Sequence, residues 1–162
     1  MVRKRAEAPL LPLEGAAERA GAYLLECDGA SFGNPGLAGI GARLVGPDGA
    51  TVGEISEPIG EATNNVAEYT ALLRGLDLAA SRRVRRVSIR MDSELVVRQV
   101  LGRYKTREAR LQELLAQVKR RLRAFDEWAI ESVPRGANAR ADALAKAGAS
   151  RHDEGGGTTQ LG

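Results

Sequence analysis

The stretch from Tyr23 to Ile55, YLLECDGASFGNPGLAGIGARLVGPDGATVGEI, decides the architecture of this chain. Apolar residues gather in residues 23–27, 40–45 and 50–55, which are lengths typical of strands. The last two runs are joined by Pro47-Asp48-Gly49, a strong turn signal. The stretch therefore predicts an antiparallel meander of three strands.

The next segment predicts a helix over residues 64–81, because Thr63 is a good N-cap and apolar residues follow at helical spacing. Residues 84–91 then alternate apolar and polar side chains, as a strand does. If the helix is a right-handed crossover, this fourth strand returns parallel to the first.

The remaining elements follow from the same patterns: a short helix over residues 93–101 that ends at Gly102, a long amphipathic helix around residues 111–125, a strand over 128–133 and an Ala-rich helix over 138–149. The order is βββαβααβα. This order predicts an α/β fold with a five-stranded mixed sheet, three strands antiparallel and then two parallel, flanked by helices.

The composition fits one soluble domain. The 162 residues are 43% hydrophobic and 28% charged, and we place the domain at residues 21–149 between mobile tails at 1–20 and 150–162. No apolar run approaches the roughly 20 residues of a membrane span, so we expect no membrane partner and a cytoplasmic location. The single cysteine, Cys27, is expected to be a small buried strand residue rather than a reactive thiol.

The positive charge permits a polyanionic partner without requiring one. The formal net charge is +3, and basic residues cluster in residues 82–86, 103–110 and 119–123. These clusters suit phosphate contacts, but a solvated helix face and a charged loop explain each of them equally well.

Four acidic residues occupy positions at which the predicted fold brings side chains together. Asp28 directly follows the first predicted strand and Asp92 follows the fourth, so both belong at one edge of the sheet. Glu68 lies near the helix stripe that faces the sheet, and Asp142 lies in the first turns of the last helix. Carboxylates in such a cluster suit Mg²⁺ or Mn²⁺. The alternative, unrelated caps and surface acids, stays open on spacing alone.

The motifs themselves resemble the ribonuclease HI (type 1 ribonuclease H) family. The similarity covers residues 23–149 and rests on Asp28-Gly29-Ala30 with Gly33-Asn34-Pro35-Gly36, Thr63-Asn64-Asn65-Val66-Ala67-Glu68, Met91-Asp92-Ser93, and Asn138-Ala139-Arg140-Ala141-Asp142-Ala143-Leu144-Ala145. The resemblance implies the ribonuclease H-like fold. It also implies that Asp28, Glu68, Asp92 and Asp142 hold two Mg²⁺ ions, with Mn²⁺ as the alternative.

The resemblance further implies contacts to the substrate. Asn34, Asn64 and Asn65 match positions that contact ribose 2′-hydroxyls in the minor groove of an RNA/DNA hybrid, and an amide suits a group that both donates and accepts. The alternatives are that Asn34 is a turn residue and that Asn64 and Asn65 are ordinary residues of a helix start.

Two departures place the chain in a subgroup of that family. The segment before Asp142 is short and lacks the family's loop histidine, while the sole histidine, His152, falls in the predicted tail. Arg135 resembles an arginine of that subgroup which contacts the scissile phosphate, with a plain loop cation as the alternative. The basic extra helix, or handle, is also missing. Lys105 and Thr106, in the segment between the predicted helices, are the substitutes we expect.

The sequence thus predicts a monomeric endonuclease that hydrolyses the RNA strand of RNA/DNA hybrids by two-metal-ion catalysis, leaving 5′-phosphate and 3′-hydroxyl ends. Two rivals remain open at this point. One is an inactive hybrid-binding module on the same fold, and the other is a related nuclease that acts on double-stranded RNA or DNA junctions.

Overall fold

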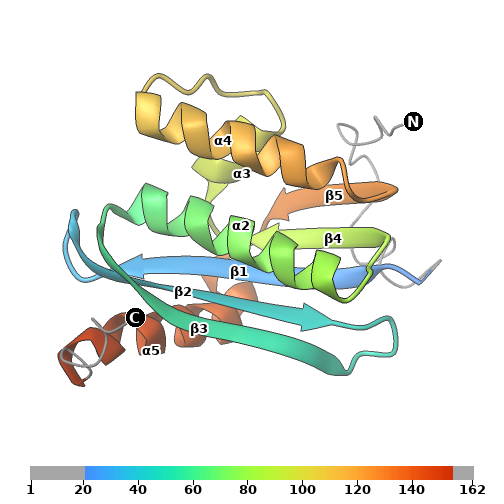
Figure 1. Cartoon of the computed structure of the whole chain (residues 1–162), viewed down its shortest axis with the longest axis horizontal. Coiled ribbons are helices and arrows are strands. Elements are labelled where there is room, and N and C mark those ends of the chain that lie inside the picture. Colours follow the sequence, from blue (N-terminus) through green and yellow to red (C-terminus); the bar gives the residue numbers. More distant parts are fainter. Residues whose placement is uncertain (1–20, 155–162) are drawn as a thin grey trace.

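The chain forms a five-stranded mixed sheet covered by helices on both faces, in a computed structural model that describes residues 21–154 (Figure 1). The strand order across the sheet is β3 (Thr51–Ala62), β2 (Gly36–Val45), β1 (Tyr23–Ser31), β4 (Arg86–Met91), β5 (Glu127–Ser132). The first three strands pair antiparallel, whereas β4 is parallel to β1 and β5 is parallel to β4. This arrangement confirms the predicted sheet.

The helices follow the predicted order: α2 (Asn64–Ser81), α3 (Glu94–Val100), α4 (Ala109–Leu122), a 3-10 turn η2 (Arg135–Asn138) and α5 (Ala139–Glu154). Figure 1 shows α2 and α4 side by side on one face of the sheet and α5 on the other. The main core fills the space between the sheet and α2, and Cys27 is fully buried in it as expected. Within residues 21–154, no helix is long and apolar enough to cross a membrane.

Helix starts are fixed by the capping residues that the sequence shows. The Thr63 hydroxyl accepts a hydrogen bond from the Val66 N–H at 3.2 Å, and α2 has the predicted bounds. Ser93 caps α3 in the same way, by accepting from the Val96 N–H at 3.2 Å. Ser93 directly follows Asp92, and Thr63 caps the helix that carries Glu68, so the two caps help to fix where these acids stand.

Several predicted boundaries were wrong, and those of the first three strands were furthest out. The strand β1 does not end at Cys27 but continues to Ser31, so Asp28 lies within the strand, because the glycine-rich segment after it pairs with β2 as far as Ser31 and Ala38. For the same reason β2 begins at Gly36 and β3 extends to Ala62. Pairing with a neighbouring strand has here overridden weak local propensity.

The last helix also extends further than residue 149. Arg151 donates to the Ser56 hydroxyl at 2.7 Å, and this contact with β3 holds another turn of α5. Residues 150–154, including His152, are therefore helical and do not belong to a tail. The predicted tail segments 1–20 and 155–162 lie outside the described residues.

Glycines let α5 approach the sheet closely. A Cβ built on Gly41 would lie 2.5 Å from the Ala145 nitrogen, and one on Gly148 would lie 2.6 Å from the Glu57 carbonyl oxygen. Real Cβ atoms do not come that near to backbone atoms. The helix that carries Asp142 therefore sits on β2 and β3 only because these positions lack side chains.

We expect Gly41→Ala to lower the free energy of unfolding by about 1–3 kcal/mol, because the added methyl must push α5 off the sheet. Urea denaturation with a circular dichroism signal measures this difference. Gly136→Ala is the matched control, since nothing lies within 4 Å of its Cβ position. Equal midpoints for Gly41→Ala and the wild-type protein would refute the close-contact interpretation.

Candidate metal centre

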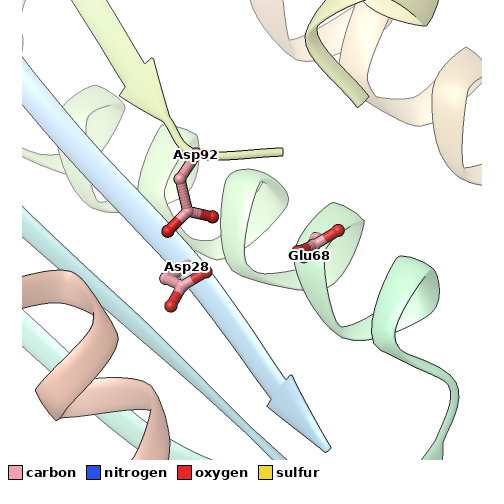
Figure 2. Close-up of side chains that lie close together, drawn as sticks. All are labelled: Asp28, Glu68 and Asp92. Atoms are coloured by element: carbon pink, nitrogen blue, oxygen red, sulfur yellow. The ribbon is translucent and has the colours of Figure 1, made fainter. Parts of the chain in front are cut away.

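Three carboxylates from three different elements meet at one end of β1 and β4. They belong to Asp28 in β1, Glu68 in α2 and Asp92 directly after β4, and one ligand oxygen of each lies within 4.8 Å of the others (Figure 2). All three acids were predicted from the sequence. Carboxylate oxygens at such spacing are a donor set for a hard divalent cation.

Strand pairing explains why Asp28 and Asp92 are neighbours. The parallel strands β1 and β4 pair Glu26 with Arg90. Asp28 and Asp92 each follow two residues later, so they lie side by side. Glu68 reaches them because Gly29 has no side chain. A Cβ built there would lie 2.5 Å from the Glu68 backbone nitrogen, so β1 and α2 touch beside the cluster.

Asp142 lies beside the three-acid group rather than within it. It lies near enough to Asp28 to raise the pKa of that residue, and its other close partner is Lys146, whose Nζ is 3.2 Å from Oδ2. The four predicted acids are thus contiguous, but the tight group consists of three. The start of α5 is tied to this region by Asn138, whose buried amide donates to the Cys27 carbonyl at 3.0 Å.

Two supporting residues were not given a role in the sequence interpretation. Asn138 was quoted only as part of a motif, although its amide anchors the turn before α5. Ser93 gives Glu68 a side-chain hydrogen bond in addition to capping α3. Ser93 directly follows Asp92, and Asn138 lies four residues before Asp142 in the same motif, so their place in the acidic motifs was the available signal.

The cluster resists full ionisation. Burial, followed by the charges of Asp92, Asp142 and Glu68, raises the pKa of Asp28 from 3.8 to about 8. Burial also raises the pKa of Glu68 to about 7, although a hydrogen bond from Ser93 lowers it. Burial likewise raises the pKa of Asp92, although the nearby charge of Arg135 lowers it. Several buried carboxylates together are costly unless protons or a cation neutralise them.

One ligand atom is left without a hydrogen bond. The Oδ2 atom of Asp92 is buried and has no hydrogen-bond partner in residues 21–154, and the nearest cation is the exposed Arg135, with Nε at 4.0 Å. A buried carboxylate oxygen without a hydrogen bond needs another partner, and beside two further carboxylates a metal ion can be that partner. The residues therefore fit the divalent cation that the sequence predicted.

The predicted substrate residues have different surroundings. The Asn34 amide oxygen accepts a hydrogen bond from the Asn64 N–H at 2.8 Å, so it holds the β1–β2 turn against the start of α2. Asn64 itself is exposed and Asn65 half-buried. Lys105 is exposed, but the Thr106 hydroxyl is buried, so the structure does not support the predicted surface contact by that side chain.

The comparisons with known proteins agree with this geometry. The family model described as reverse transcriptase-like matches residues 26–148. The ribonuclease HI of Halobacterium salinarum is 44% identical over 128 residues, which are 79% of this chain and 64% of that protein. The chain thus spans just under two thirds of that relative's length.

Solved structures show the same likeness. The crystal structure of RNase H1 from Halobacterium salinarum matches with a TM-score of 0.79 at 42% identity, over 81% of this chain and 99% of that one. LC11-RNase H1, solved in complex with an RNA/DNA hybrid, matches with a TM-score of 0.74 at 41% identity, over 80% and 97%. The architecture is therefore the RNase H fold, with the acids beside the end of β4, where Asp28 of β1 and Glu68 of α2 meet Asp92.

Within that fold class, this chain belongs to the ribonuclease HI family. The predicted family and fold are confirmed.

The raised pKa values predict how stability depends on pH when no metal is bound. The unfolded chain ionises Asp28 near 3.8, while the folded chain keeps the proton to about pH 8, so the free energy of unfolding falls as pH rises between these values. In chelator, we expect Asp28→Asn to raise the Tm at pH 8 by roughly 5 °C and to change it little at pH 4. Differential scanning fluorimetry measures both.

Added Mg²⁺ should reverse the trend, because a cation binds the ionised acids and displaces their protons. The rise in Tm on adding Mg²⁺ should be larger at pH 8 than at pH 5 for the wild-type protein. A Tm that increases with pH in chelator would show that the cluster is not held protonated.

Proposed function

We propose that the protein is a metal-dependent endonuclease that hydrolyses the RNA strand of RNA/DNA hybrids. The observation that carries the proposal is the group of three carboxylates whose oxygens lie within 4.8 Å of one another and whose pKa values are all raised. A family relative solved with an RNA/DNA hybrid supports the choice of substrate. An inactive hybrid-binding module would have no use for buried acids facing phosphates.

In this proposal Asp28, Glu68 and Asp92 hold divalent cations, with Asp142 completing the set from α5. Two Mg²⁺ ions bound there, or Mn²⁺ in their place, supply an activated water on one side of the phosphodiester and charge stabilisation on the other. Water would attack the phosphorus and the bond to the 3′-oxygen would break, so the products would carry 5′-phosphate and 3′-hydroxyl ends.

The chain's own residues then position the substrate. Arg135 is exposed on η2 beside Asp92, where its guanidinium suits a phosphate oxygen. Asn64 and Asn65, at the start of the helix that carries Glu68, can offer their amides to ribose 2′-hydroxyls. Asn34 supports that start by accepting a hydrogen bond from the Asn64 N–H.

We also predict that the protein is monomeric and cytoplasmic.

Cleavage of sequence-matched hybrid, double-stranded RNA and double-stranded DNA with Mg²⁺ tests the proposal against its rivals. We expect cleavage of the hybrid alone, in its RNA strand. Binding of hybrid without cleavage would favour the inactive module, and faster cleavage of double-stranded RNA or of DNA junctions would favour the related nuclease.

We expect the double variant Asn64→Ala and Asn65→Ala to weaken hybrid binding by about 0.5–1.5 kcal/mol for each lost hydrogen bond. Affinity for double-stranded DNA should not change, because phosphate contacts are shared by both duplexes. Fluorescence anisotropy with both duplexes gives the ratio.

Asn34→Ala provides the contrasting control. It removes the acceptor of the Asn64 N–H, so it should lower the Tm while the hybrid-to-DNA affinity ratio stays near the wild-type value. If the double variant shows this same pattern, RNA recognition lies elsewhere on the protein.

A further inference from the structure

A buried hydrogen bond between two side chains joins α2 to α3. The Tyr69 hydroxyl donates to the Gln99 amide oxygen at 2.6 Å, and the two residues are 0% and 4% exposed. The Arg98–Glu94 pair of α3, by contrast, is open to solvent. Figure 1 shows the two helices next to each other. The Tyr69–Gln99 bond is therefore an internal contact between helices.

This bond cannot break without leaving a buried polar group unsatisfied. The Tyr69 ring belongs to the main hydrophobic core. Burial raises the pKa of Tyr69, so the phenol stays protonated and can donate. A buried hydroxyl or amide that loses its partner cannot bond to water instead, so its loss costs more than that of an exposed pair. The relative position of α2 and α3 is therefore strongly constrained at this contact.

Each end of the bond lies close to a candidate metal ligand. Tyr69 directly follows Glu68 in α2. Gln99 lies in α3, a helix of seven residues that begins just after Asp92, with Ser93 as its N-cap. Because so short a helix moves as one piece, a shift of Gln99 relative to Tyr69 should also move Asp92 relative to Glu68.

The three carboxylates form a triangle, and the backbone holds two of its sides (Figure 2). Pairing of β1 with β4 sets the distance between Asp28 and Asp92. The close contact of Gly29 with α2 sets the distance between Asp28 and Glu68. On the third side, no backbone hydrogen bond joins α2 to β4 or to α3 within residues 21–154. The side-chain bond between α2 and α3 connects the elements on this side.

We propose that the Tyr69–Gln99 hydrogen bond is a positioning contact, which holds Glu68 at the distance from Asp92 that a divalent cation needs. The inference rests on the part of the proposed function that places a cation among the acids. Neither Tyr69 nor Gln99 touches metal or substrate in this account. Their bond acts before binding, so that the cation meets carboxylates that are already arranged.

Tyr69→Phe tests the proposal, because it removes one hydroxyl and keeps the ring in the core. We expect the Kd for Mg²⁺ to rise about three- to tenfold, less than the roughly 10–100-fold for a direct partner of a metal ligand. Isothermal titration calorimetry without nucleic acid measures this Kd. The Mg²⁺ concentration for half-maximal cleavage should rise by the same factor, while the rate at saturating Mg²⁺ stays within about twofold of wild type.

The double variant Tyr69→Phe with Gln99→Met separates positioning from stability. Tyr69→Phe alone leaves the Gln99 amide buried without its donor and should lower the Tm. Replacing both partners by apolar groups of similar shape can be nearly neutral, so the double variant should recover most of the Tm. Its Kd for Mg²⁺ should stay as high as that of Tyr69→Phe, because the bond is still absent.

Gly75→Ala is the matched control for a general loss of packing in α2. Its Cβ would lie 2.8 Å from the Cys27 sulfur, so the variant should have a lower Tm. Because Gly75 lies about two turns from Glu68, its Kd for Mg²⁺ should stay within about twofold of wild type.

The outcomes separate this inference from the proposed function. A wild-type protein that binds neither Mg²⁺ nor Mn²⁺ overturns both. One that binds the cation but cleaves no hybrid overturns the proposed function alone. If the wild-type protein binds Mg²⁺ and Tyr69→Phe binds it equally tightly, the inference alone is overturned. The same follows if the double variant regains affinity together with stability, because the bond would then serve stability only.

Discussion

Asp92→Asn is expected to reduce cleavage of hybrid by more than about a hundredfold at ordinary Mg²⁺, while the protein stays folded. The swap keeps the shape of the side chain but removes an anionic ligand from the three-acid group. Loss of mere outer partners of metal ligands already costs about 10–100-fold, so loss of a ligand should exceed that. Initial rates on a labelled hybrid, with circular dichroism for folding, provide the measurement.

Asp126→Asn is the matched control for this prediction. Asp126 is an exposed aspartate in the turn before β5 and pairs with Arg85 at 2.9 Å, so the same chemical change there acts on surface contacts outside the three-acid group. Its turnover should equal that of the wild-type protein. Wild-type turnover by Asp92→Asn as well would remove the acid cluster from the mechanism.

The second large effect is expected from Gly29→Ala. The new Cβ would lie 2.5 Å from the Glu68 backbone nitrogen, so α2 must move away from β1 at the point where Glu68 meets Asp28. A displacement of about 1 Å at a reacting centre can cost about a hundredfold in rate. We expect a loss of that order, together with weaker stabilisation by Mg²⁺ and a lower Tm. Rates measured well below that Tm separate misplacement from unfolding.

Gly75→Ala distinguishes a local effect on the site from a general loss of packing. It lies in the same helix, and its Cβ would meet the Cys27 sulfur at 2.8 Å and a Leu25 methyl at 3.1 Å, about two turns away from Glu68. It should therefore lower stability but retain most of the activity. If both glycine variants lose activity in proportion to their loss of stability, the close approach at Gly29 has no special part in catalysis.

Most of the fold could be predicted because the signals were local and repeated. The helix of residues 64–81 combines a capping threonine with helical apolar spacing, and its bounds were correct. The strand that holds Asp28 was predicted too short, because Gly29 and Ser31 have low strand propensity and only pairing with β2 keeps them extended. Long-range pairing of this kind leaves no mark in a short stretch of sequence.

The acids of the candidate site could also be predicted, but the direction of some polar side chains could not. Asp28 and Asp92 were located by the topology of parallel strands, which depends on element order alone. Thr106 looked like a surface contact among lysines and arginines, yet its hydroxyl oxygen is buried and has no hydrogen-bond partner in residues 21–154. Asn34 was open between a turn residue and a substrate contact; its amide oxygen accepts the Asn64 N–H, and the substrate contact stays a prediction. The surroundings of such side chains depend on residues that are distant in the sequence.

The most direct test of the proposed function is strand-resolved cleavage of one hybrid, with the RNA and DNA strands labelled differently, first in chelator and then after Mg²⁺ is added back. We expect no cleavage in chelator, and internal cuts confined to the RNA strand once Mg²⁺ is present, with 5′-phosphate ends on the fragments. Cleavage that persists in chelator, or cuts in the DNA strand, would contradict it, as would a folded protein that leaves both strands intact with Mg²⁺.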